Sequence, residues 1–100
     1  MIPPELIGTW ETADPRYEER SFELTTDRII LALGEDGKKS YLIERFEKSQ
    51  EFRATTYTLT YTNLVEGASD TVAFYYEPRD GGVIRFKNQQ KIEWKKGATP

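Results

Sequence analysis

The stretch Thr56-Tyr57-Thr58-Leu59-Thr60-Tyr61-Thr62 decides the fold of this chain. Large apolar or aromatic side chains occupy every second position, and threonines fill the positions between them. This alternation has the period of two residues that is typical of a β-strand, and its residue types favour strands. We therefore predict a strand here, with one face turned to an interior and the other turned to solvent.

The same alternation recurs elsewhere in the chain, as in Val83-Ile84-Arg85-Phe86-Lys87, Lys91-Ile92-Glu93-Trp94-Lys95 and Arg20-Ser21-Phe22-Glu23-Leu24. Residue types that form turns separate the alternating segments at short intervals. The predicted turns lie near residues 14–16, 26–27, 34–37, 50–53, 66–69, 78–82 and 88–89. They divide the chain into eight predicted strands, near residues 6–13, 17–26, 28–34, 40–49, 55–64, 70–77, 82–87 and 90–96.

The connections between these strands are too short for a crossover, so each strand should pair with the next one. The sequence therefore predicts an all-β fold in which eight strands form an antiparallel up-and-down meander. Closure into a small barrel is favoured because it removes both sheet edges, and a β-sandwich is the alternative. The length of 100 residues fits one domain, which would span residues 1–100.

Composition excludes several kinds of chemistry. The chain contains no cysteine and no histidine, so disulfides, thiolate chemistry and Cys/His zinc sites are ruled out. The usual pairs of nucleophile and base are also missing, and we predict neither an enzyme nor a cofactor. The segment Gly34-Glu35-Asp36-Gly37 lacks the alternating ligands of a calcium loop and is predicted to be a hairpin turn. No metal site is predicted.

The net charge of −3 argues against nucleic-acid binding, and no apolar run is long enough to span a membrane. The charge is nevertheless uneven, because residues 79–96 contain six basic and two acidic residues. Pairing of this basic hairpin with Glu11, Glu19 and Glu23 on the first two strands explains the pattern, and an acidic protein partner is the alternative. We expect a monomer. Residues 1–5 do not resemble a signal peptide, which favours a cytoplasmic location for the chain as given.

A short motif near the N-terminus points to a known architecture. Gly8-Thr9-Trp10 opens the first strand of the predicted meander, and in this it resembles the calycin group of lipocalins, intracellular fatty-acid-binding proteins and avidins. The resemblance implies that Trp10 packs across the closed end of the barrel, and we expect it to contact Trp94 or Arg20. The Thr-Asp-Tyr signature of lipocalins and the C-terminal Arg-x-Tyr of fatty-acid-binding proteins are absent, so the resemblance implies no particular ligand.

The alternation also predicts which side chains fill the barrel. The expected interior consists of Trp10, Phe22, Leu24, Ile29, Leu31, Leu33, Tyr41, Ile43, Tyr57, Leu59, Tyr61, Val72, Phe74, Tyr76, Ile84, Phe86, Ile92 and Trp94. The fourth strand carries Leu42 and Phe46 on its opposite face, which predicts either a β-bulge or a wet core.

One arginine and several aromatic residues define a candidate binding site. Arg20 is in phase with Phe22 and is therefore predicted to point inward. In a meander, Tyr41 and Tyr61 should gather at the far end of the barrel, in the half that holds Arg20. Together these three residues could hold a carboxylate or another small anion, with Phe86 and Tyr57 as the apolar wall.

Two classes of function follow from this interior. The first is a carrier or sensor that binds a small apolar or anionic molecule inside the barrel. The second is a protein-interaction or structural module with a filled core and no ligand. For Arg20 the structural alternative is that its guanidinium stacks on Trp10 and hydrogen-bonds a carbonyl.

Overall fold

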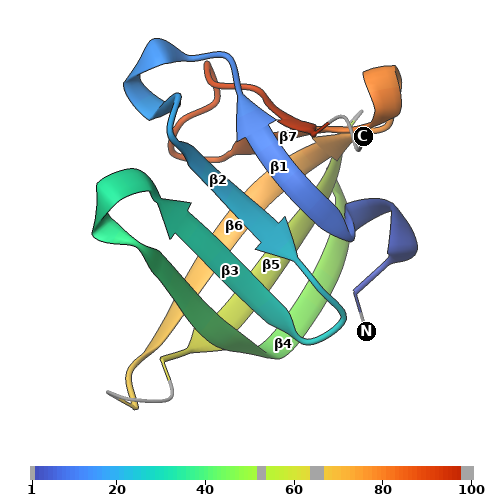
Figure 1. Ribbon diagram of the computed structural model, residues 1–100. Helices are drawn as coiled ribbons and strands as arrows, with labels where there is room; N and C mark the ends of the chain where they lie inside the picture. Colours follow the sequence, from blue (N-terminus) through green and yellow to red (C-terminus); the bar gives the residue numbers. More distant parts are fainter. Residues whose placement is uncertain (1, 52–53, 64–66, 98–100) are drawn as a thin grey trace.

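Eight strands follow one another around a closed antiparallel barrel in the computed structural model, which describes residues 2–51, 54–63 and 67–97 (Figure 1). The strands are β1 (Gly8–Thr12), β2 (Arg20–Leu24), β3 (Arg28–Leu33), β4 (Lys38–Glu51), β5 (Ala54–Thr62), β6 (Ser69–Glu77), β7 (Val83–Phe86) and β8 (Trp94–Lys96). Each strand pairs with its neighbour in sequence, and β1 pairs with β8 to close the barrel. The predicted all-β meander and its closure are confirmed, and the sandwich alternative is not observed.

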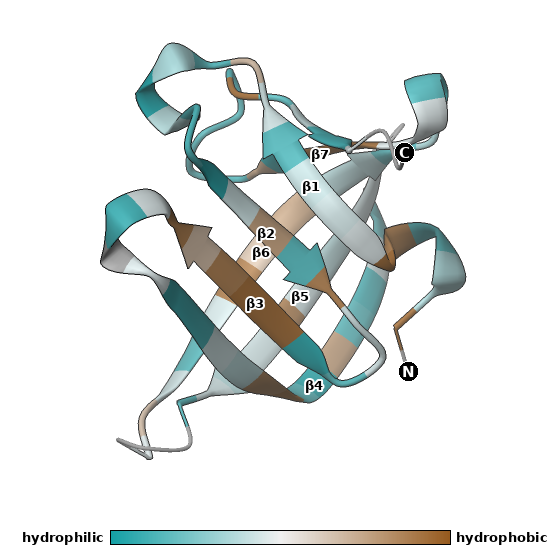
Figure 2. Cartoon of the chain, viewed as in Figure 1, coloured by the Kyte–Doolittle hydropathy of each residue, from teal (hydrophilic) through white to brown (hydrophobic). Residues whose placement is uncertain are grey.

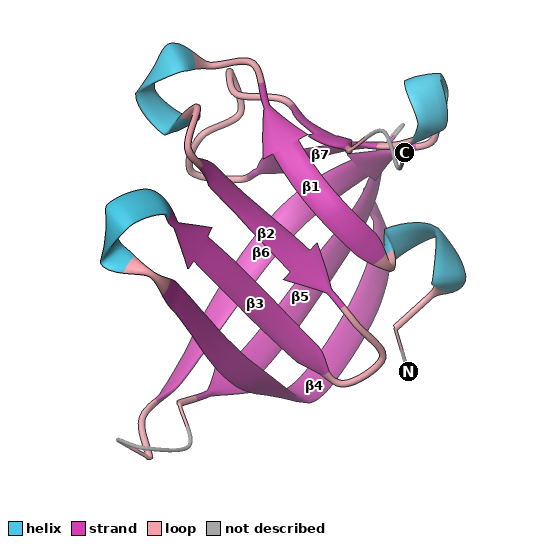
Figure 3. Ribbon diagram, viewed as in Figure 1, coloured by secondary structure: helices cyan, strands magenta, loops and turns pink. Residues whose placement is uncertain are grey.

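Single turns of 3-10 helix lie in the connections between strands and before β1 (Figure 3). They are η1 (Pro4–Leu6), η2 (Pro15–Tyr17), η3 (Gly34–Asp36) and η4 (Arg79–Gly81). The turn η2 explains why the second strand begins three residues later than predicted. Asp14 accepts a hydrogen bond from the backbone N–H of Arg16, and Pro15 at the first helical position favours the helical turn over an extended strand.

The fourth strand contains the predicted bulge. Leu42 is in register with Thr62, but the register shifts between Ile43 and Arg45, and Phe46 then lies opposite Leu59. The extra residue reverses the alternation, which moves Phe46 from the outer face to the inner one. The ring of Phe46 stacks on Tyr57 with centroids 5.1 Å apart. The bulge therefore resolves the conflict between the two apolar faces of this strand.

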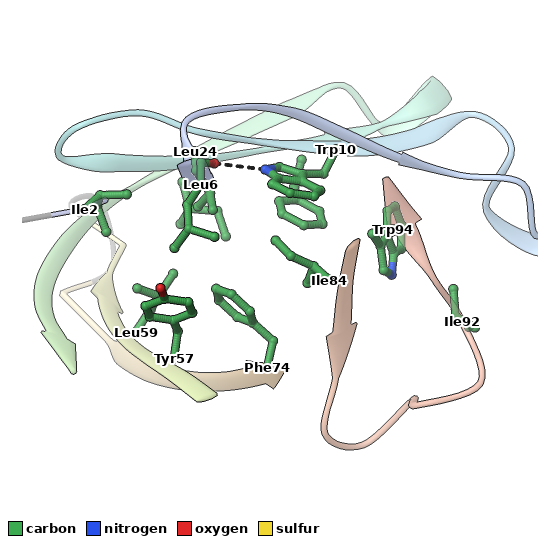
Figure 4. Packing of buried hydrophobic residues seen from close by; sticks show 12 residues of the cluster. Ile2, Leu6, Trp10, Leu24, Tyr57, Leu59, Phe74, Ile84, Ile92 and Trp94 are labelled. Carbon is green, nitrogen blue, oxygen red and sulfur yellow. Dashed lines mark hydrogen bonds between the residues drawn. The ribbon is translucent and has the colours of Figure 1, made fainter. Parts of the chain in front are cut away.

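Twelve buried residues form the core, and ten of them are labelled in Figure 4. The cluster consists of Ile2, Leu6, Trp10, Phe22, Leu24, Ile29, Tyr57, Leu59, Phe74, Ile84, Ile92 and Trp94. All but Ile2 and Leu6 belong to the predicted interior. Figure 2 shows that β3 is hydrophobic over most of its length, whereas the helical turns at the barrel ends are mostly hydrophilic.

Trp10 is fully buried and joins the N-terminal segment to the barrel. Its indole Nε1 donates a hydrogen bond of 2.9 Å to the carbonyl of Leu6 (Figure 4). The ammonium of Lys96 lies 5.4 Å from the centroid of the indole and donates to the carbonyl of Glu5 at 2.8 Å. Residues 2–6 are thus fixed across the barrel end where β1 starts, and Trp10 packs at this closed end as expected.

The predicted partners of Trp10 are wrong, however. Its ring contacts are Phe22, stacked at 6.3 Å, and Tyr76, edge-on at 6.4 Å. Trp94 is the first residue of β8 rather than a late one, because residues 87–93 form a connection instead of the first half of the predicted strand. The two indoles are consequently not in contact with each other, and the ring of Phe22 contacts both of them.

Candidate functional site

The two ends of the barrel differ in how they are covered. Residues 2–6 cover the end where β1 and β3 begin, and both Ile2 and Leu6 are buried there. We call this the closed end. The opposite end, where β2, β4 and β6 begin, has no such segment among the described residues, and we call it the open end (Figure 1).

One side of the open end is covered by the β1–β2 connection. The ring of Tyr17 lies 5.9 Å from the ring of Trp94, which is buried beneath it. The side-chain amide of Gln89 donates a 3.0 Å hydrogen bond to the Tyr17 hydroxyl, so the β1–β2 and β7–β8 connections are joined. This contact protects Trp94 and Ile92 and leaves the other side of the open end without that cover.

Inward-facing side chains on β3, β4, β5, β6 and β7 are only half-buried on the uncovered side. This set consists of Leu31, Leu33, Tyr41, Tyr61, Val72 and Phe86. Their apolar surface is in contact with solvent at one end and with the buried core at the other. An apolar group entering from the open end would therefore meet an apolar wall.

The structure brings Tyr41 and Tyr61 together, as the meander predicted. Their ring centroids are 5.1 Å apart in an edge arrangement with an interplanar angle of 62°. Tyr61 lies directly opposite Asp70 on β6, so these two side chains project from the same face of the sheet. Burial, the charge of Asp70 and a hydrogen bond to Asp70 raise the pKa of the Tyr61 hydroxyl.

Arg20 lies on the inward face as predicted, since it is opposite Leu33, but it is exposed, so the prediction of a buried guanidinium is wrong. It is the first residue of β2 and is exposed, because at the end of the barrel the alternating position opens into solvent. It lies opposite Leu33, whereas Tyr41 is in register with Ile29 and Leu24, four residues further along β2. The backbones of Arg20 and Tyr41 are therefore about 16 Å apart along the sheet surface. The structural alternative for Arg20 is also wrong, since the cation over Trp10 is Lys96.

Arg20 nevertheless lies at the edge of the open end. It lines a pocket of about 550 Å³ between the β1–β2 and β3–β4 connections. Leu33, Arg16 and three acidic residues, Glu18, Glu19 and Glu35, line the same pocket. Among the described residues Arg20 forms no ion pair. Its charge is available to a ligand at the entrance but does not reach the pair of tyrosines.

The two residues predicted as an apolar wall are placed differently. Phe86 is half-buried at the open end and contacts Phe22 and Trp94. Tyr57 is only 1% exposed and packs between Phe46 and Phe74 in the buried core. Phe86 can therefore contact a molecule at the open end, whereas Tyr57 lies beneath that surface.

Sequence reasoning missed two charged residues at the open end. Lys39 lies opposite Leu31, and Asp70 lies opposite Tyr61, so both are on the inward face although both are exposed. The signal was present in the alternation, because Lys39 is in phase with Tyr41 and Asp70 with Val72. Lys39 and Asp70 also differ in charge.

A larger pocket, of about 890 Å³, lies outside the barrel along the seam between β1 and β8. Its charges are largely matched within the protein: Lys95 lies opposite Glu11, and the guanidinium of Arg85 bonds Glu93 and Glu77. The register places Lys95 opposite Glu11 as expected, but the described residues show no ion pair between them, and Arg85 is paired with Glu77 and Glu93.

Comparisons with known proteins give no relative of this chain: no family model, no curated protein and no solved structure matches it. The class of protein is therefore defined by the fold alone, an eight-stranded antiparallel β-barrel with one closed end. Within the described ranges, no helix has the length and apolar character needed to cross a membrane. The same residues contain no cluster of three or more acidic side chains suited to a metal ion.

Proposed function

We propose that this protein is a carrier or sensor that binds a small molecule with an apolar body at the open end of the barrel. The observation that carries the proposal is the half-burial of inward-facing side chains such as Leu31, Leu33 and Phe86 beside a fully buried core. A closed end and an apolar open end are the arrangement in which an eight-stranded barrel can hold one small ligand. The resemblance to lipocalin-like barrels agrees with this proposal.

An acidic group on the ligand is favoured on the side of the entrance that carries Arg20. Arg20 has no carboxylate partner among the described residues, and Lys39 projects from the same face two strands away. A charge-assisted hydrogen bond from a guanidinium contributes about 1.5–3 kcal/mol. In this proposal the acid is bound by Arg20 and Lys39, and the apolar body contacts Leu33 and Phe86.

A matched pair of dyes tests the proposal. Phenylnaphthylamine is neutral, and anilinonaphthalene sulfonate is nearly the same molecule with one added negative charge. Both should gain fluorescence on binding, and the sulfonate should bind more tightly. Arg20→Met should weaken the sulfonate at least about tenfold and leave the neutral dye unchanged. Arg45→Met is the control, because Arg45 is exposed on the outer face of β4.

A second variant tests the location. Leu33→Trp adds bulk at the edge of the open end and should reduce binding of both dyes, whereas Lys38→Trp on the outer face should not. If neither dye binds the unmodified protein, the barrel is filled and the alternative of an interaction module is supported. Equal affinity for the two dyes would contradict the role of Arg20 while leaving the apolar site in place.

A further inference from the structure

The open end contains a second group of side chains, which takes no part in the proposed binding of an acid by Arg20 and Lys39. This group consists of Tyr41, Tyr61 and Asp70. The two rings come from β4 and β5, and the carboxylate comes from β6. Both tyrosines are half-buried and Asp70 is exposed, so the three side chains border the entrance. Three adjacent strands thus contribute to one small polar and aromatic surface.

The Asp70 carboxylate accepts one backbone hydrogen bond and has no countercharge paired with it among the described residues. One carboxylate oxygen accepts a 2.8 Å hydrogen bond from the backbone N–H of Thr71. Asp70 forms no ion pair with any of the described lysines or arginines. The nearest cation on the inward face of the neighbouring strands is Lys39, which precedes Tyr41 by two residues and is exposed.

The tyrosines add a second attraction for positive charge. The face of an aromatic ring is electron-rich and attracts an ammonium group within about 6 Å of its centroid. The edge arrangement of Tyr41 and Tyr61 presents ring surface at two orientations beside one carboxylate. Burial and the charge of Asp70 raise the pKa of the Tyr61 hydroxyl, so the ring stays neutral.

An anion is the wrong ligand for this surface. It would face the Asp70 carboxylate next to Tyr61, and Arg20 is too far away to neutralise it. The backbone of Lys39 is also about 16 Å from that of Asp70, because Ile43, four residues further along β4, is the residue in register with Tyr61 and Asp70. A cation would be attracted both by the Asp70 carboxylate and by the faces of the two tyrosine rings. We propose that Tyr41, Tyr61 and Asp70 form a subsite for an organic cation, specifically an alkylammonium group whose apolar substituent extends into the open end.

This inference rests on the proposed function, because the apolar substituent uses the same barrel interior. It extends that function by assigning opposite charge preferences to the two sides of the entrance, an acid beside Arg20 and an ammonium group beside Asp70. A ligand that carries both groups would span the entrance between β2 and β6.

The test measures displacement of bound phenylnaphthylamine by octyltrimethylammonium and by octanol. The cation should displace the dye at a concentration at least about tenfold lower than octanol does. Asp70→Asn should remove most of this preference and leave octanol unchanged. Glu47→Gln makes the same change in charge on the outer face of β4, where Glu47 is exposed, and should have no effect.

A probe without an alkyl chain separates this inference from the proposed function. Tetramethylammonium should shift the ring resonances of Tyr41 and Tyr61 in an NMR titration, and the shifts should be lost in Asp70→Asn. If the dye binds but octyltrimethylammonium is unaffected by Asp70→Asn, the cation subsite is wrong and the apolar site stands. If tetramethylammonium shifts the rings but no dye binds, the cation subsite stands and the carrier proposal is wrong.

Discussion

Replacement of Trp10 is the most direct test of how the closed end is built. The indole is fully buried, stacks on Phe22, meets Tyr76 edge-on and donates a hydrogen bond to Leu6. A buried tryptophan removes up to about 250 Å² from water, which corresponds to an upper bound of about 6 kcal/mol. Compactness of the unfolded chain reduces this figure to about 4–5 kcal/mol. The alanine that replaces it recovers part of the area, but the lost hydrogen bond leaves the Leu6 carbonyl unpaired.

We therefore expect Trp10→Ala to lower the free energy of unfolding by about 4 kcal/mol, as is found for large core truncations. The free energy of unfolding is measured by urea denaturation, with far-UV circular dichroism as the signal. A loss of this size can unfold a small domain outright, so Trp10→Phe is the second variant: it keeps a ring, loses the hydrogen bond and should cost about 1–2 kcal/mol. Thr9→Ala, on the exposed face of the same strand, is the control. A decrease below about 1 kcal/mol for Trp10→Ala would refute the assignment of Trp10 as the residue that holds residues 2–6 on the barrel.

Two further predictions concern stability. Gly82 has φ of +116°, and a Cβ at this position would lie 3.0 Å from the Trp10 ring, so Gly82→Ala should cost about 1–3 kcal/mol more than Gly81→Ala. Gly81 also has positive φ but has open space around it, and equal urea midpoints for the two variants would contradict the contact with Trp10. The hydrogen bond from Arg85 is the largest of the effects that lower the pKa of Glu93 below its usual 4.5, so the folded protein binds this proton more weakly than the unfolded chain does. The resulting stabilisation is present above pH 4.5 and is lost as the pH falls through the folded pKa. Glu93→Gln should therefore reduce the difference in stability between neutral pH and about pH 3, and an unchanged pH profile would show that the ion pair does not contribute.

The architecture could be predicted from sequence because it depends on local signals. Alternation in segments such as 56–62 identifies strands, and short polar turns leave no room for crossovers, so the strand order follows directly. The apolar face of most strands could be assigned for the same reason, whereas the fourth strand carried apolar residues on both faces. The irregularity of β4 was also visible, because Phe46 stood out of phase with Ile43, and of the two predicted alternatives the structure contains the bulge.

The exposure of the candidate site could not be predicted in the same way. Alternation places Arg20 on the inward face. Whether other parts of the barrel cover Arg20, the first residue of β2, depends on where this end of the strand lies in the closed barrel. The same limit applies to Tyr57, which packs between Phe46 and Phe74 and is buried beneath the open end. Periodicity reports the direction of a side chain and carries no information about its depth in the barrel.

By itself, the sequence determined the eight strands, their order and most of the core, because hydrophobic periodicity and turn chemistry act over a few residues. Tertiary structure alone decided that Asp70 lies directly opposite Tyr61, beside the predicted pair of tyrosines, while Arg20 stands about 16 Å from Tyr41. The physical reason is the stagger of the strands around the barrel. The register between strands sets which residues of different strands are neighbours, and it is fixed by the packing of the whole barrel and not by any single segment.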